Sequence, residues 1–476
     1  MPHKCCGDST GQKGQVIQQY RMTSVQSLAV WLTPSYGLAL LTTLLLAWLL
    51  VSTLLTGRGK NLPPGPRGWR AIYSIVKLTE FLFSNKDIIF VPYDTRQRRL
   101  RRIFHSVMGV YGEGAERFES LVLGELGLMV DELRGCAGRD VRMDEVLGKP
   151  LKNILCMLLL GERPHTTDHV EIMERFDFRA NKIFTTKVQL ALTLFPFLWW
   201  VPNKYRTYLD QAGDSRRDVQ KLITDHRSSY VPGKHRGMLD TLFEAQRKPG
   251  NEWLDDETVT VYATILFFGS HVTTRSTLLA AFMFLLNNPD VVRKVQEEID
   301  RVIGDRLPRV SDRSDMNYTE AVVLETLRTY YQIPFISLRN AREDFEYKGY
   351  TIPKKTMIMT NSECLDYNPD HFEDPMKFKP ERLLDSKGTI YPADHPVRKA
   401  FMPFGLGARI CPGEVFARSR IFLFIVHVLQ NFDIFPPDSE PIVKEDPRAY
   451  DKTLEGFVRQ TPPYKLKFRP RTAKTC

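Results

Sequence analysis

The chain has 476 residues, of which 43% are hydrophobic and 26% are charged, so it is long enough to bury a large core. Its formal net charge of +10 suits an anionic membrane surface or an acidic protein partner better than nucleic acid, because basic residues cluster only at 96–102 and no nucleic-acid-binding signature occurs. An odd number of irregularly spaced cysteines argues against a disulfide framework and a structural zinc site.

An uncharged, strongly apolar run lies near the N-terminus, within residues 22–57. Its length predicts a membrane-spanning helix at 36–57, preceded by an N-terminal extension at 1–35. A cleaved signal peptide is the alternative, although the run is long for one and lacks a small-residue exit. Basic residues follow the run at once, so the positive-inside rule favours a cytosolic body.

Next comes a stiff Pro/Gly hinge at 58–69, which includes NLPPGPRG and cannot continue a helix, followed by the body at 70–476. The stretch 257–287 is the longest apolar segment of the body and is apolar on most faces, which is typical of a helix through the middle of a domain. Helical periodicity also predicts helices at 113–135, 168–190, 214–229, 291–304 and 318–331.

The pattern changes in the C-terminal third of the chain. Residues 345–362 alternate in the manner of strands around a turn at Lys348-Gly349, and 412–430 form one more apolar helical stretch. The sequence therefore predicts a mainly α fold with a small β portion.

A single cysteine lies in the glycine-rich sequence FMPFGLGARICPGE, residues 401–414. Pro412 fits the first turn of a helix, so Cys411 is expected at a helix N-terminus, where backbone N–H groups stabilise an anion. Gly405 and Gly413 let something flat approach the backbone. Such a thiolate can bind a metal such as haem iron. A buried structural cysteine and a nucleophile with a partner histidine are the alternatives.

Two further motifs, each weak alone, precede this loop. Glu325 and Arg328 lie one helical turn apart, and Arg382 lies in FKPERLL. Taken together with FGLGARICPG, these motifs resemble those of the cytochromes P450. The resemblance runs through about 90–460 and is strongest to animal microsomal members that oxidise steroids and foreign compounds.

The resemblance implies the cytochrome P450 fold and a haem-thiolate monooxygenase with haem b as its cofactor. Cys411 would be the axial ligand of the haem iron. The other haem-binding residues would be Phe404, Gly405, Gly413, Arg101, Arg339 and Arg409, with the arginines pairing with the haem propionates.

Other positions take their expected functions from the same resemblance. Glu325, Arg328 and Arg382 would hold the fold behind the cysteine. Thr273, in the stretch 257–287, would be the catalytic residue that helps deliver protons to bound oxygen.

The resemblance also implies partners. Electrons from NADPH would come through NADPH-cytochrome P450 reductase, with cytochrome b5 as a further partner, and O2 would oxidise a small apolar substrate that is steroid-, lipid- or xenobiotic-like. The protein would lie in the endoplasmic reticulum membrane with its catalytic domain facing the cytosol. Arg418, Arg420 and the 96–102 cluster would present a basic face to the acidic reductase.

Three departures from the family pattern stand out. Val272 occupies the position of an expected acid in GSHVTT, where His271 is either a substitute relay or a packed side chain. Gln97 replaces an expected tryptophan. Only residues 70–89 fill a longer segment of the family, so part of the N-terminal β region is expected to be missing, in a splice form or a divergent member. These departures support an alternative, a non-catalytic haem-binding relative that binds a ligand or partner at the membrane.

Overall fold

The structure is a computed structural model that describes residues 83–107 (except 90 and 92), 113–163, 195–333, 338–444 and 458–471, with Thr42, Thr43, Glu80 and single positions between 171 and 192. The predicted anchor apart from Thr42 and Thr43, the hinge, and most of the predicted helix 168–190 lie outside the described residues. Among the described helices, none combines the length and the apolar character needed to cross a membrane.

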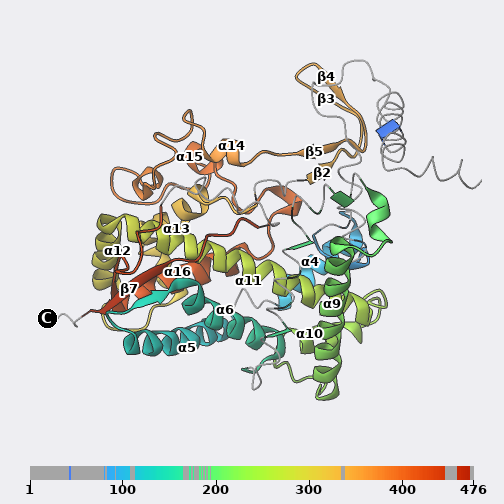
Figure 1. Ribbon diagram of the computed structural model, residues 1–476, viewed down its shortest axis with the longest axis horizontal. Coiled ribbons are helices and arrows are strands. Elements are labelled where there is room, and N and C mark those ends of the chain that lie inside the picture. Colours follow the sequence, from blue (N-terminus) through green and yellow to red (C-terminus); the bar gives the residue numbers. More distant parts are fainter. Residues whose placement is uncertain are drawn as a thin grey trace, which may run out of the picture. The chain divides into compact units, whose positions relative to one another are not determined.

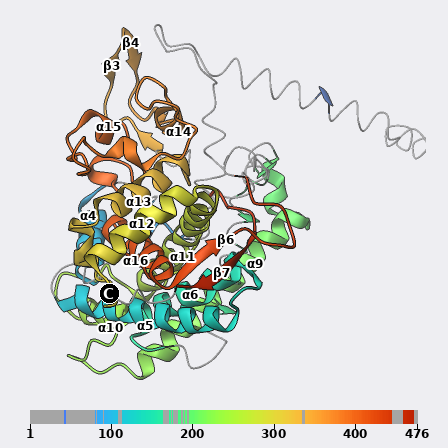
Figure 2. The ribbon, with the colours of Figure 1, turned by 90° about the vertical axis from the view of Figure 1, so that its left-hand side faces the viewer.

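The chain divides into two compact units. One consists of Met1–Arg67 with Asn340–Thr356, and the other of Gly68–Arg339 with Met357–Cys476. The larger unit is mainly helical, as the sequence predicts (Figures 1 and 2). Its described helices are α4 (Thr95–Val107), α5 (Glu113–Gly135), α6 (Met143–Leu160), α9 (Lys204–Ser228), α10 (Met238–Gln246), α11 (Asp256–Asn287), α12 (Pro289–Val302), α13 (Asn317–Thr329), α14 (Glu363–Asp366), α15 (Pro396–Lys399) and α16 (Glu414–Asn431), with 3-10 turns η1 (Pro196–Trp199), η2 (Val310–Ser314), η3 (Pro380–Leu383) and η4 (Gly407–Arg409).

The central element of the larger unit is α11, with α6, α13 and α16 packed alongside it (Figures 1 and 2). Its start is fixed by the Asp255 carboxylate, which accepts a hydrogen bond from the Thr258 N–H at 2.8 Å. Its end precedes Pro289, which occupies the first turn of α12. Nearly all of its side chains are buried, which confirms the prediction made from the apolar stretch 257–287.

Two helix starts differ from the sequence prediction. The helix predicted at 214–229 begins at Lys204, because the Asn203 side chain accepts hydrogen bonds from the N–H groups of Tyr205 and Arg206. The helix after Cys411 begins at Glu414 with Gly413 as its N-cap, so the prediction that Pro412 lies in its first turn is wrong.

The β portion is small, as predicted. In the larger unit, β1 (Asp140–Arg142), β7 (Lys465–Pro470) and β6 (Phe432–Phe435) form an antiparallel sheet in that order. Strands β2 (Leu338–Asn340) and β5 (Met357–Met359) form a second pair. In the smaller unit, β3 (Phe345–Tyr347) and β4 (Tyr350–Ile352) form a hairpin whose turn is the predicted Lys348-Gly349, both with positive φ.

Candidate functional site

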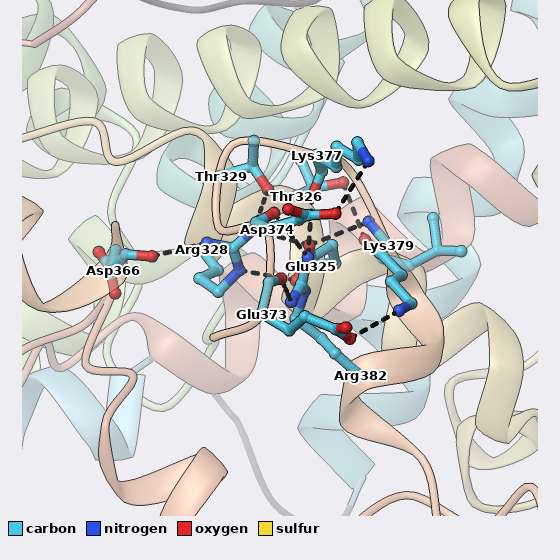
Figure 3. A network of polar contacts seen from close by, with 11 residues as sticks. Glu325, Thr326, Arg328, Thr329, Asp366, Glu373, Asp374, Lys377, Lys379 and Arg382 are labelled. Atoms are coloured by element: carbon cyan, nitrogen blue, oxygen red, sulfur yellow. Dashed lines mark hydrogen bonds and ion pairs between the residues drawn. The ribbon is translucent and has the colours of Figure 1, made fainter. Parts of the chain in front are cut away.

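A buried charge cluster joins α13 to η3. Both Glu325 and Arg328 have side chains that are 0% exposed. The Glu325 carboxylate accepts two hydrogen bonds from Arg328, at 2.8 and 2.7 Å, and one from Arg382 Nε at 2.9 Å. Figure 3 shows the carboxylate between the two guanidinium groups. The structure thus brings together the three residues that were expected to hold the fold.

The remaining donors of this cluster also find partners. Arg328 Nη1 donates to the Asp366 carbonyl at 2.6 Å, and the Arg382 guanidinium donates to the carbonyls of Glu373, Asp374 and Lys377 (Figure 3). A buried charge is costly unless it is paired and hydrogen-bonded. The ion pairs and hydrogen bonds of the two arginines are therefore what makes this cluster stable in the core.

Cys411 lies in a tight loop between η4 and α16. Its N–H donates to the Phe404 carbonyl at 2.8 Å, which closes the loop. Gly405 and Gly407 have φ values of +74° and +68°, a conformation that favours glycine. A Cβ added at Gly413 would lie 3.9 Å from the Cys411 sulfur, an ordinary contact, so glycine is not required there by crowding.

The Cys411 thiol lies at an exposed position of this crowded loop. Loss of hydration and the negative charge of Glu414 raise the pKa of the thiol, and the backbone N–H of Gly413 and the charge of Arg101 offset this only in part. The thiolate is the form that binds a metal, and Gly413 and Arg101 are the groups in the described residues that act in its favour.

Of the three arginines that sequence reasoning assigned to one cofactor, Arg101 lies beside Cys411, and Arg101 and Arg339 both lie close to Arg409. Arg101 Nη2 donates to the Ile410 carbonyl at 2.6 Å, next to the cysteine. Burial and the charges of Arg339 and Arg101 lower the pKa of Arg409. Within the described residues, neither Arg101 nor Arg409 forms an ion pair with a carboxylate. The charges of Asp87 and Asp94 act in the opposite direction on Arg409, so the cations near the thiol are offset only in part.

Arg409 and Gln97 also hold the segment that precedes α4. Arg409 donates to the carbonyls of Ile88, Ile89 and Val91, and the buried Gln97 amide also donates to the Ile88 carbonyl, at 3.2 Å. Gln97, at the position of the expected tryptophan, therefore anchors this segment.

One face of α11 is open at the middle of the helix. Gly269 is exposed and Thr273, one turn later, is half-buried, whereas His271 and Val272 are buried. The Thr273 hydroxyl donates to the Gly269 carbonyl at 2.6 Å. Thr273 therefore presents its remaining oxygen lone pairs at the open face, and Val272 offers no proton-carrying group.

The basic face assigned to α16 is wrong. Arg420 is only 1% exposed, and Arg418 is largely buried, with its guanidinium paired with Glu320 and Glu414. Sequence reasoning missed this burial although Phe416, Arg420 and Leu423 share one helical stripe with apolar neighbours. On α4, by contrast, Arg98, Arg99 and Arg102 are exposed.

Gln332 was not singled out from the sequence, yet it contacts the open turn of α11. Its amide donates to the Thr273 carbonyl at 2.5 Å and to the Thr277 hydroxyl. No periodic or motif signal marks this residue, because it lies just beyond the end of α13.

A mainly helical domain with an exposed cysteine among arginines defines a protein that can hold a flat, anionic metal cofactor. Comparisons with known proteins identify the family. The cytochrome P450 family model matches residues 70–468. Cytochrome P450 2D28 of Mesocricetus auratus is 31% identical over 396 residues, which are 81% of this chain and 76% of that protein. Cytochrome P450 2B4 of Oryctolagus cuniculus is 30% identical over 405 residues, 83% of this chain and 80% of that protein.

Solved structures agree. A zebra fish cytochrome P450 with progesterone has a TM-score of 0.70 and 26% identity, covering 88% of this chain and 91% of that chain. Another with abiraterone has a TM-score of 0.68 and 25% identity, covering 89% and 92%. The chain belongs to the cytochrome P450 family, and the resemblance stated from its motifs is confirmed. Membership of this family implies that the protein is a monooxygenase that uses haem iron and O2.

The residues present fit a haem. A porphyrin carries two propionates, which complement the cations at Arg101, Arg339 and Arg409, and its iron accepts a thiolate such as that of Cys411. The observation that supports the fit is that Arg101 and Arg409 lie close together and form no ion pair with a carboxylate in the described part of the chain, although the charges of Asp87 and Asp94 reach Arg409.

Proposed function

We propose that the protein is a membrane-anchored haem-thiolate monooxygenase that draws its electrons from NADPH through a reductase. One atom of O2 enters a C–H bond of an apolar substrate, and the other leaves as water with two electrons and two protons. The single observation that carries the proposal is the Cys411 thiol, flanked by the Gly413 N–H and by a cluster of arginines.

The chain's own residues have distinct functions in this proposal. Cys411 would bind the haem iron, with the Gly413 N–H and the Arg101 charge acting in favour of its thiolate. Arg101, Arg339 and Arg409 would hold the propionates, and Phe404 and Gly405 would shape the loop that receives the haem. Haem supplies the activation of oxygen when it is bound.

On α11, Thr273 would orient a proton donor at the open face of the helix. Its hydroxyl proton is held by the Gly269 carbonyl, so its lone pairs are directed to a water or a ligand. Because Val272 carries no proton, water must deliver protons to this face.

Membrane attachment is supported by two features. The apolar stretch 36–57 is long enough for an anchor. In the body at 70–476, Phe197 and Trp200 around η1 are 56% and 74% exposed, and Lys204 follows them. Exposed aromatic residues beside a lysine suit the interface of a bilayer. These features favour the endoplasmic reticulum membrane with the body in the cytosol.

The substrate and the electron donor follow from the relatives and from charge. The zebra fish structures hold progesterone and abiraterone, which supports a small apolar substrate of steroid, lipid or xenobiotic type. The exposed Arg98, Arg99 and Arg102 of α4 suit an acidic surface of NADPH-cytochrome P450 reductase or of cytochrome b5.

Reconstitution with the reductase tests this function directly. The full chain in lipid vesicles, given NADPH, ¹⁸O2 and a panel of steroids and apolar xenobiotics, is expected to yield a product with one ¹⁸O atom. The product should be absent without reductase and with Cys411→Ser. Binding of haem and steroid without any labelled product would contradict the proposal.

That contradicting result would instead favour the second candidate, a ligand-binding relative without turnover. The observation in its favour is the buried Val272 at a position where an acid was expected.

A further inference from the structure

Arg420 is a buried cation without a counter-charge. It lies on α16, is 1% exposed, and its guanidinium stacks 3.9 Å from the centre of the Phe416 ring. Burial lowers the pKa of Arg420 to about 9, so the side chain is still charged at neutral pH. Its Nε and Nη1 have no hydrogen-bond partner within the described residues, and no described carboxylate pairs with it.

Among the described residues, the one Arg420 nitrogen that finds hydrogen-bond partners reaches across to α11. Nη2 donates to the Ser270 carbonyl at 3.2 Å and to the Thr274 hydroxyl at 2.8 Å. These two residues flank Val272 and Thr273 and belong to the same helical turn as the open face formed by Gly269 and Thr273. Arg420 thus forms hydrogen bonds to that turn on the side of α11 that packs against α16.

A buried charge with unsatisfied donors costs stability, and apolar replacement of such a group is often neutral or stabilising. The hydrogen bonds that Arg420 forms within the described residues all go to one turn of α11. We propose that Arg420 is a positioning residue that holds the α11 turn Ser270–Thr274, and so sets the place of Thr273 and its proton-delivering water. The link to proton delivery rests on the proposed function, whereas the hold on the turn does not.

Hydrogen exchange followed by mass spectrometry tests the hold on the turn in the full chain. Arg420→Met is expected to speed amide exchange in peptides that cover 269–275 by about tenfold or more, because both hydrogen bonds to this turn are lost and one charge-assisted bond alone corresponds to about that factor. The Tm should stay unchanged or rise, because an unpaired buried charge is removed. Thr274→Val, which keeps the charge and loses one acceptor, should speed exchange there by a smaller factor.

Arg418→Met is the matched control, since this arginine is on the same helix but pairs with Glu320 and Glu414 instead of α11. It should lower the Tm and leave exchange at 269–275 unchanged. Unchanged exchange at this turn in Arg420→Met would overturn the proposal, whether or not the protein binds haem.

A second readout separates positioning from packing. With reductase and substrate, Arg420→Met is expected to release a several-fold larger share of the consumed NADPH electrons as hydrogen peroxide, because Thr273 no longer holds its water in place. Faster exchange at 269–275 with an unchanged peroxide share would reduce Arg420 to a structural residue and overturn the positioning function. Failure of the wild type to bind haem would contradict the proposed function, and the exchange data would still decide the hold on the turn.

Discussion

Two arginine-rich regions of the larger unit differ in how their charges are met. Around Glu325, two guanidinium groups form ion pairs with one carboxylate and hydrogen bonds with backbone carbonyls. Both arginines therefore have an anionic partner within the chain. Near Cys411, Arg101 and Arg409 donate hydrogen bonds to backbone carbonyls and repel one another, and neither forms an ion pair in the described residues. The difference teaches that the first cluster is neutralised and hydrogen-bonded within the chain, whereas the arginines of the second keep the capacity to pair with an anion, as the proposed function requires.

Breaking the structural cluster should give the largest effect. Glu325→Gln leaves Arg328 and Arg382 buried without a counter-charge, a change that costs about 3–5 kcal/mol. Thermal unfolding should show a Tm lower by about 10 °C, if the protein still folds. A Tm within about 2 °C of the wild type would contradict the structural assignment, and Glu373→Gln, on a solvent-exposed neighbour, is the control.

Removing a cation near Cys411 should change haem binding more than it changes stability. Arg101→Gln relieves repulsion and keeps an N–H donor for the Ile410 carbonyl, so the Tm of the haem-free protein should change little. Haem should dissociate about ten times faster, because one charge-assisted hydrogen bond to a propionate is lost. Transfer of haem to an acceptor protein measures this rate. An unchanged rate would remove Arg101 from the haem site.

A milder change sharpens the comparison. Arg382→Lys keeps the charge beside Glu325 but loses the fork that serves the carbonyls of Glu373, Asp374 and Lys377. The free energy of unfolding should fall by about 1–2 kcal/mol in a denaturant titration. A loss as large as that of Glu325→Gln would mean that geometry, not charge, holds the cluster.

The smallest effect concerns exposed pairs at the start of α11. Burial raises the pKa of Asp255, but hydrogen bonds from Lys86 and Thr258 outweigh it and lower that pKa to about 2. Hydrogen bonds from Lys86 and Ser84 likewise lower the pKa of Glu257 to about 2, against the effect of burial. Since unfolded carboxyls titrate near pH 4, these pairs stabilise the fold above about pH 4 and lose that contribution as the pH falls toward about 2.

Lys86→Met should therefore flatten the dependence of unfolding on pH between about pH 4 and about pH 2. Acid titration followed by circular dichroism checks this, with Lys86→Arg as the charge-preserving control. A mutant curve that parallels the wild type would show that the pairs contribute nothing.

Prediction from the sequence succeeded where a pattern has one physical reading. The apolar stretch 257–287 became α11 at Asp256–Asn287, because a helix apolar on most faces must be buried. The turn at Lys348-Gly349 was found because positive φ favours such residues. The motif around Cys411 pointed to the correct family.

Prediction failed where burial depends on partners distant in the sequence. Arg420 was read as surface charge, yet α16 packs that side chain against Ser270 and Thr274, more than a hundred residues earlier. Gln332 has no local pattern that foretells its contact with Thr273. The start of α16 was misplaced because Pro412 suits both a first helical turn and the loop before it.

The absorption spectrum of the dithionite-reduced, CO-treated protein tests the central claim most directly, with Cys411→Ser measured beside it. The account predicts the red-shifted band of a thiolate-ligated haem in the wild type and its loss in the mutant, at an unchanged Tm of the haem-free protein. A wild type that binds no haem, or a band that survives in Cys411→Ser, would contradict the account.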